Sequence, residues 1–331
     1  MKYIRFNTIL TCFLLIIVPL LLESEELSPG VYQKNILSKE QLYEKGYSLY
    51  KARKYKEALS FLMPSAKQGD KDAQFVLGNM YYNGKGILKN NKKALFWMKK
   101  SAKQGDSSIQ AYLGSMYRVL ENYKKAYYWY QKAAKNGNTD ALCSLGDMYY
   151  SGNGVLKDYK KAFVLYEKAA KSGNENGQFN LGNMYNSGKG IPQNYKNAFS
   201  WYQKAASQGN NMSQYWLGYM YYTGKGIIKD YRKAFYWFEK SAKHNNSPAI
   251  SWVGSMYYTG KGIPQNYKKA FYWYEKSAKH NPDGQYWLGQ IYFFGHGVIK
   301  DNKKAKYWIN KAVKSGYPPA KIFWDKYLSE K

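Results

Sequence analysis

A period of about 36 residues runs through most of the chain and limits how it can fold. When the sequence is aligned with itself, glycines fall into one column, each preceded by Leu or, once, by Val253. Successive members of the column are 36, 32, 36, 36, 36 and 35 residues apart. Such a period is typical of stacked helical repeats, which can account for all 331 residues without two unrelated domains. The column consists of Gly78, Gly114, Gly146, Gly182, Gly218, Gly254 and Gly289.

Each repeat is predicted to contain a helix, a loop and a second helix. In the repeat around Gly218 these are MSQYWLGYMYY, TGKGIIK and YRKAFYWFEKSAK, and apolar residues recur at intervals of three and four. Gly46 marks an atypical first repeat, which brings the expected number of helix pairs to eight. Pro318 and Pro319 begin a last segment that we expect to form a capping helix.

Polar residues recur at the expected helix ends. One column begins the second helices, where short acceptor side chains cap free N–H groups. It comprises Asn90, Asn122, Asp158, Asn194, Asp230, Asn266 and Asp301. Gly69, Gly105, Gly137, Gly173 and Gly209 are expected to end second helices in a left-handed conformation, with Asn245 and Asn281 taking that role later.

A glycine inside a helix costs about 1 kcal/mol relative to alanine, so the glycine column needs a packing reason. We expect the glycines to let the second helix come close, with a column of alanines facing them. A second column, mostly Trp, is expected to fill the core beside these alanines. The alanines are Ala94, Ala126, Ala162, Ala198, Ala234, Ala270 and Ala305. The second column is Trp97, Trp129, Leu165, Trp201, Trp237, Trp273 and Trp308.

Repeats such as LGYMYYTGKGIIKDYRKAFYWFEKSAK resemble Sel-1-like repeats, which are tetratricopeptide-type helix pairs with a G-x-G loop. The resemblance covers roughly residues 40–328. It implies an all-α, right-handed solenoid whose concave face holds a partner, and exported bacterial members act in the envelope or in host interaction. The chain lacks the paired cysteines of a disulfide-linked branch of this family. The expected organisation is a signal or anchor over 1–24, a linker over 25–38, the solenoid over 39–316 and the capping helix over 317–331.

The N-terminus is typical of an export signal. Lys2 and Arg5 precede an apolar stretch over residues 9–22, which is short for a membrane span and contains Pro19. No A-x-A site follows, so both a cleaved signal and an uncleaved anchor remain open. The expected location is the periplasm, the cell envelope or the exterior, where Cys143 would be the only cysteine of a cleaved chain.

The charge is strongly positive, at +29, and carried almost entirely by lysine. One interpretation is a solvated surface with the codon bias of an AT-rich genome, and the other is an anionic partner. Only four arginines are present. Because arginine forks usually recognise phosphates and base edges, nucleic acid is not the expected partner.

No complete catalytic or metal-binding set is visible, and we expect neither an enzyme nor a cofactor. Ser48 and Lys51 match S-x-x-K, but the chain has neither S-D-N nor K-T-G. The G-x-G triplets follow helices rather than strands, and never extend to a nucleotide-binding motif. His244, His280 and His296 lack metal-ligand spacing.

Residues that vary between repeats are the candidates for binding. The positions two before and one after the column glycine lie three residues apart and share a helix face. If the first helices line the concave side, as the resemblance implies, this face is polar in early repeats and Trp-lined in the last three. The candidate residues are Tyr112, Asn183, Trp216, Tyr219, Trp252, Ser255, Trp287 and Gln290. The alternative is that these Trp residues pack between repeats. Substituting Trp216 and Trp252 with alanine would then unfold the chain rather than only weaken binding.

Two functions fit these patterns. The first is a non-catalytic exported scaffold for a protein or peptide partner. The second is an envelope factor that binds cell-wall glycan or an anionic membrane surface through its lysines. Binding that falls steeply with ionic strength would favour the second.

Overall fold

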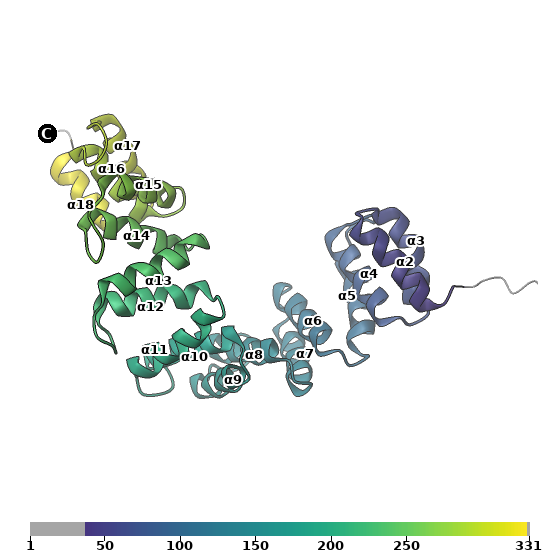
Figure 1. Ribbon diagram of the computed structural model, residues 1–331. Helices are drawn as coiled ribbons and strands as arrows, with labels where there is room; N and C mark the ends of the chain where they lie inside the picture. The colour runs from purple at the N-terminus through teal and green to yellow at the C-terminus, as the bar shows by residue number, and fades with distance from the viewer. Residues whose placement is uncertain (1–36, 330–331) are drawn as a thin grey trace, which may run out of the picture. The chain divides into compact units, whose positions relative to one another are not determined.

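The computed structural model describes residues 37–329, and these residues form 17 helices and no strand. They make eight consecutive helix pairs followed by a single helix, as predicted (Figure 1). The expected export signal lies outside the described residues. None of the described helices is both long and apolar enough to cross a membrane.

The chain divides into two compact units, with the boundary between Ala94 and Leu95 inside α5. Up to this boundary the helices are α2 (Lys39–Lys51), α3 (Tyr55–Lys67), α4 (Lys71–Asn83) and the start of α5 (Asn91–Ala102). In this first unit α3 packs against α2 and α4, and α2 also contacts α4.

The second unit holds six helix pairs and the terminal helix. Its first helices are α6 (Ser107–Val119), α8 (Thr139–Ser151), α10 (Glu175–Ser187), α12 (Asn211–Thr223), α14 (Ser247–Thr259) and α16 (Pro282–Phe294). Their partners are α7 (Tyr123–Lys135), α9 (Tyr159–Lys171), α11 (Tyr195–Ser207), α13 (Tyr231–Lys243), α15 (Tyr267–Ala278) and α17 (Asn302–Lys314), and α18 is Pro318–Tyr327. Each helix packs against the next, and α8 also contacts α10. We call the surface formed by α6, α8, α10, α12, α14 and α16 the first-helix face.

Five of the column glycines, from Gly114 to Gly254, make room for an aromatic ring, and Gly289 makes room for Ile309. A Cβ at Gly182 would lie 2.7 Å from the ring of Tyr202, and one at Gly218 would lie 2.7 Å from Phe238. The expectation that the alanine column faces the glycines was therefore wrong. Those alanines are buried, but the side chain that contacts Gly182 or Gly218 is the ring one residue after the Trp column. That position points directly at the first helix.

The predicted caps of the second helices are confirmed in all seven repeats. The Asp230 Oδ1, for example, accepts from the N–H of Lys233 at 3.0 Å. Equivalent bonds are made by the other six members of the column.

The helix ends differ from prediction at one residue. Asn245 takes the left-handed conformation, with φ of 59°. Asn281 does not: its φ is −131°, and its side chain instead caps α16 by accepting from the N–H of Asp283 at 3.0 Å. This repeat is one residue shorter, so α15 leads into α16 without a left-handed residue.

The terminal helix covers the last pair, as predicted. Ala320 and Phe323 of α18 pack with Ile309 and Ala312 of α17 in one buried cluster. This contact covers the apolar side of α17.

Candidate binding pockets on the first-helix face

The three predicted tryptophans on the first-helix face are half-buried and pack on the preceding helix pair. Trp216 stacks on Tyr202 with ring centroids 6.0 Å apart, and Trp252 stacks on Phe238 at 5.2 Å. Trp287 stacks on Tyr274 at 5.8 Å. One face of each indole therefore contributes to packing between repeats, which was the alternative interpretation of these residues.

The same tryptophans also line pockets. A pocket of about 350 Å³ is bounded by Trp216, Tyr219, Asn186 and Lys225, together with Tyr195 and Tyr215. A second pocket, of about 330 Å³, shares Trp216 and Asn186 with the first and extends along α10 past Asn180 and Asn183 to Asp147. We call these two adjoining hollows the central pockets. They bring the predicted residues Asn183, Trp216 and Tyr219 together.

The central pockets lie where an aromatic column of the repeat is interrupted. At the position of Asn186 four other repeats carry Tyr82, Tyr150, Tyr222 or Tyr258, while α16 carries Phe293 and α6 carries Arg118. Tyr150 packs edge-on against Tyr159 at 5.1 Å, and Tyr222 packs in the same way against Tyr231. Because Asn186 is small, Tyr195 lacks such a neighbour and the space stays open.

The missing tyrosine ring also leaves the ammonium group of Lys225 without the hydroxyl partner that equivalent lysines have. In flanking repeats Lys189 donates to the hydroxyl of Tyr150 at 2.8 Å, and Lys261 donates to that of Tyr222 at 3.0 Å. Lys225 has no phenol at this position. Its Nζ lies 5.6 Å from the ring centroid of Tyr195 and 5.8 Å from that of Tyr219, so a cation borders the open pocket.

Two hydrogen-bond acceptors line the floor of the second central pocket. The hydroxyl of Tyr166 donates to the Asp147 carboxylate at 2.7 Å, and that of Tyr202 donates to the Asn183 amide oxygen at 2.8 Å. Burial raises the pKa of Asp147 above its usual range, although the Tyr166 hydrogen bond and the charge of Arg118 act to lower it. Burial also raises the pKa of Tyr166 and of Tyr202, so both hydroxyls stay neutral donors.

The remaining predicted residues lie apart from the central pockets. Trp252, Ser255 and Trp287 border a smaller pocket of about 180 Å³ with Ser251 and Asp283. Gln290 donates its amide to the hydroxyl of Tyr286 at 2.5 Å, and Tyr112 is exposed on α6. The structure thus brings the candidate residues together in two separate places rather than in one groove.

Sequence reasoning missed Asn186, Lys225, Asp147 and Asn180. The signal for Asn186 was present as a gap in a column of tyrosines, which a search for unusual aromatic residues passes over. Asp147 and Asn180 belong to the two variable positions already singled out, but neither was selected.

The described residues offer few metal-ligating or nucleophilic groups. Within residues 37–329 no group of three or more His, Cys, Asp or Glu side chains could hold a metal ion. The Cys143 thiol donates to the Asn174 side chain at 3.3 Å, and burial raises its pKa to about 12. A neutral, buried thiol is a poor nucleophile.

The repeats match a known family over most of the chain. The Sel1 repeat model matches residues 71–106, 110–138, 139–174, 176–210, 211–246, 247–281 and 282–317. The chain belongs to the Sel1 repeat family. The seven matched repeats coincide with the pairs from α4 and α5 to α16 and α17, whereas the pair α2 and α3 lies before the first match. Sel1 repeats generally bind protein partners and serve as non-catalytic scaffolds.

Two solved Sel1 repeat structures are similar to this chain. A protective antigen present in uropathogenic Escherichia coli strains is 32% identical, with a TM-score of 0.74, over 88% of this chain. The alignment spans 66% of that protein, so the relative extends well beyond it. A Sel1 repeat protein from Oxalobacter formigenes is 30% identical, with a TM-score of 0.72, over 87% of each chain. No curated protein matches the chain.

Proposed function

We propose that this Sel1 repeat protein is a non-catalytic, exported scaffold that holds a segment of a protein partner against the first-helix face of its second unit. The observation that carries the proposal is the pair of central pockets, which meet at Trp216 and Asn186. The concave side of the solenoid is then the first-helix face, and the contact of α8 with α10 supports this, since first helices of adjacent pairs approach one another there.

The chemistry of the central pockets suits an extended peptide. Asn180, Asn183 and Asn186 supply amides that can pair with a peptide backbone. Trp216 and Tyr219 supply flat apolar area for a side chain, and Lys225 supplies a cation for a carboxylate. Aromatic side chains such as these are enriched at the centre of protein interfaces.

Export is part of the proposal and rests on the N-terminal sequence. Lys2 and Arg5 followed by the apolar stretch over 9–22 have the order of a secretory signal. A signal cleaved after export and an uncleaved anchor both place the repeats outside the cytoplasm.

The substitution N186Y tests the binding site. Tyrosine occupies this position in other repeats, so the variant should fold, and its ring should fill the space that the central pockets share. The full-length chain is used to capture material from an envelope extract at low and at moderate salt, and bound proteins are identified by mass spectrometry. We expect a discrete protein retained by the wild type at moderate salt and depleted at least about tenfold by N186Y.

S200Y is the matched control. Ser200 is exposed on α11, where other second helices carry Tyr128, Tyr236 or Tyr272, so this change adds the same side chain away from the central pockets. Equal capture by N186Y, S200Y and the wild type would contradict the proposed site. This comparison is sharper than W216A, because removing Trp216 also removes its stack on Tyr202.

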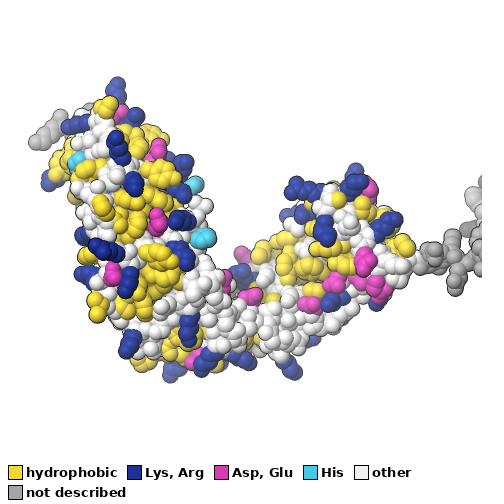
Figure 2. All heavy atoms as spheres, viewed as in Figure 1, with side chains coloured by type: hydrophobic (Ala, Val, Ile, Leu, Met, Phe, Trp, Pro, Cys, Tyr) yellow, Lys and Arg dark blue, Asp and Glu magenta, His cyan; other side chains and the backbone are white. Residues whose placement is uncertain are grey.

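Binding of an anionic polymer is the second candidate, favoured by the net charge of +29. Figure 2 shows Lys and Arg distributed among hydrophobic side chains of the second unit, not gathered in one block. Many lysines also lie over rings of their own chain, such as Lys204 at 4.1 Å from the Trp201 centroid. If the captured material is glycan or lipid that moderate salt releases, the lysines carry the function.

A further inference from the structure

In the seven matched Sel1 repeats, the second helices carry a tryptophan at one position in all but one. Trp201, Trp237, Trp273 and Trp308 each pack on a core cluster formed by the second helix of the preceding pair and the first helix of their own pair. At this position α9 carries Leu165. The residue before it is Val164, where most other second helices have Phe or Tyr. This repeat therefore lacks an indole at a place where its neighbours bury one.

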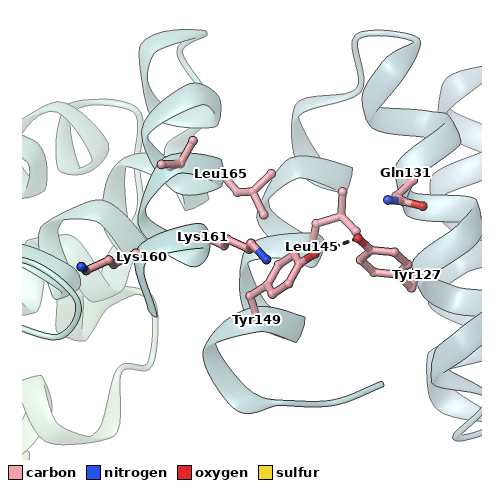
Figure 3. Close-up of a pocket in the computed structure, with 8 residues that line it drawn as sticks. Tyr127, Gln131, Leu145, Tyr149, Lys160, Lys161 and Leu165 are labelled. Carbon is pink, nitrogen blue, oxygen red and sulfur yellow. Dashed lines mark hydrogen bonds between the residues drawn. The ribbon is translucent and has the colours of Figure 1, made fainter. Parts of the chain in front are cut away.

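The missing indole leaves a pocket of about 420 Å³ between α7, α8 and α9 (Figure 3). Its walls include Tyr127, Leu145, Tyr149 and Leu165. In the next repeat Phe163, Leu181 and Tyr185 hold these wall positions, and Trp201 fills the space. Leu181 is fully buried there, whereas Leu145 is 5% exposed, as expected if a covering side chain is absent. We call this hollow the α9 pocket.

The lysines around the α9 pocket are arranged as if an aromatic ring were present. Three residues after each tryptophan of the column, a lysine lies over the indole with its Nζ 4.1 to 5.5 Å from the ring centroid. The equivalent residue here is Lys168, and Leu165 offers it no ring. An aromatic group bound in the α9 pocket would supply the ring that this lysine position normally covers.

The rim of the α9 pocket favours a negative charge beside that ring. Lys160 and Lys161 belong to the pocket, and Lys168 lies one turn further along α9. The acidic groups of α9 are already paired: Asp158 with Lys161 at 3.6 Å and Glu167 with Lys171 at 3.0 Å. Lys161 is therefore partly neutralised by Asp158, whereas Lys160 and Lys168 keep a net positive charge along α9 that complements a carboxylate.

Tyr127 adds a polar group that the equivalent slots lack. Four other repeats carry Phe163, Phe199, Phe235 or Phe271 at this position, and α5 carries Leu95. The hydroxyls of Tyr127 and Tyr149 share a hydrogen bond of 2.8 Å, drawn as a dashed line in Figure 3. Burial and this hydrogen bond raise the pKa of Tyr127 to about 12, so its hydroxyl stays neutral. A neutral phenol oxygen has lone pairs to accept from an indole N–H.

We propose that the α9 pocket binds a tryptophan side chain of a partner polypeptide in which acidic residues flank the tryptophan. The proposal rests on the open indole slot, the unused lysine position and the positive rim. It is independent of the central pockets, because its walls come from α7, α8 and α9 and share no residue with them.

The test uses the full-length chain and a fluorescein-labelled, N-acetylated peptide with one Trp between two Asp residues, measured by fluorescence anisotropy. We expect saturable binding with a dissociation constant on the order of 0.1–1 mM. Peptides with Leu in place of Trp, or with Lys in place of Asp, should bind at least about tenfold more weakly.

The decisive variant is L165W, which places in this repeat the indole that the others carry. It should fold with an unchanged or higher thermal midpoint and weaken peptide binding at least about tenfold. The control S200W adds an indole at an exposed position of α11 and should bind like the wild type. K168E should also weaken peptide binding. Because Lys168 is exposed, this variant should fold, so it tests the proposal even if L165W does not fold.

Several results would overturn the proposal. These are no saturable binding by the wild type, equal binding of the Leu or the Lys peptide, and equal binding by a folded L165W or by K168E. Binding of free indole-3-propionate without binding of the peptide would also overturn it, since the ligand would then be a small aromatic acid rather than a polypeptide.

Discussion

Asp147 and Asn183 occupy the same position on consecutive first helices, and each accepts a hydrogen bond from a buried tyrosine of its partner helix. The acceptors are nearly the same shape, but only Asp147 can ionise. Although Asp147 is exposed, burial of part of its carboxylate raises its pKa, so ionisation works weakly against folding at this site. Exchanging Asp and Asn at these two positions therefore tests how the second central pocket responds to a negative charge.

The substitution D147N should stabilise the fold at neutral pH. A carboxyl whose pKa is raised on folding favours the folded state below the unfolded value near 3.8, and this contribution is lost as the pH rises through the folded value. Asparagine cannot ionise and keeps the bond from Tyr166. Thermal unfolding followed by circular dichroism should show D147N melting above the wild type at pH 7, with the difference shrinking towards pH 4.

The reverse substitution serves as the control. N183D places a carboxyl under Tyr202 and should destabilise the fold at pH 7 by about 1–3 kcal/mol, the usual cost of a poorly solvated polar group. If D147N melts below the wild type at pH 7, the Asp147 carboxylate is stabilising and the account of the pocket floor is wrong.

At the scale of elements, the close approach of the two helices in the pairs from α6 and α7 to α14 and α15 depends on one glycine and one ring. Gly146, Gly182 and Gly218 face Tyr166, Tyr202 and Phe238. The ring that the glycine accommodates also forms the platform on which the next repeat places a side chain, such as Trp216 on Tyr202. The contact of Tyr202 with Gly182 inside one pair thus positions Trp216, which forms a wall of the central pockets between that pair and the next.

The substitution G182A tests this contact. The added Cβ would lie 2.7 Å from the Tyr202 ring, and overpacking of this kind costs about 1–3 kcal/mol. The better helix propensity of alanine offsets at most about 1 kcal/mol. Urea unfolding followed by circular dichroism should therefore show a less stable chain. S200A, at an exposed position of α11, should leave stability unchanged, and a G182A variant as stable as S200A would contradict the account.

The sequence predicted the elements well because each is marked by a repeated physical requirement. The seven Asp and Asn caps and the eight helix pairs follow from the columns alone. The error at Asn281 arose because one repeat is a residue shorter. The pockets were harder to foresee, since both form where a large side chain is missing, at Asn186 and at Leu165. Such gaps become visible only when the structure shows what the neighbouring repeats place there.

At the scale of the whole molecule, the repeat geometry extends beyond the recognisable motif. The pair α2 and α3 lies outside the matched Sel1 repeats, yet a Cβ at Gly46 would lie 2.8 Å from Leu62, as in the later pairs. The positions that are the same in all repeats form the helix pairs. The positions that differ between repeats therefore distinguish this scaffold from others. The proposed partner sites are the two places where variation opens a pocket.

Hydroxyl-radical footprinting of the full-length chain, alone and with its captured partner, tests the central claim most directly. Mass spectrometry measures oxidation at each aromatic side chain. The account predicts that oxidation of Trp216 and Tyr219 falls in the complex, while that of Trp237 and Trp273 on the second helices is unchanged. Unchanged oxidation of Trp216 and Tyr219 in the complex, with protection confined to second helices, would contradict binding at the first-helix face.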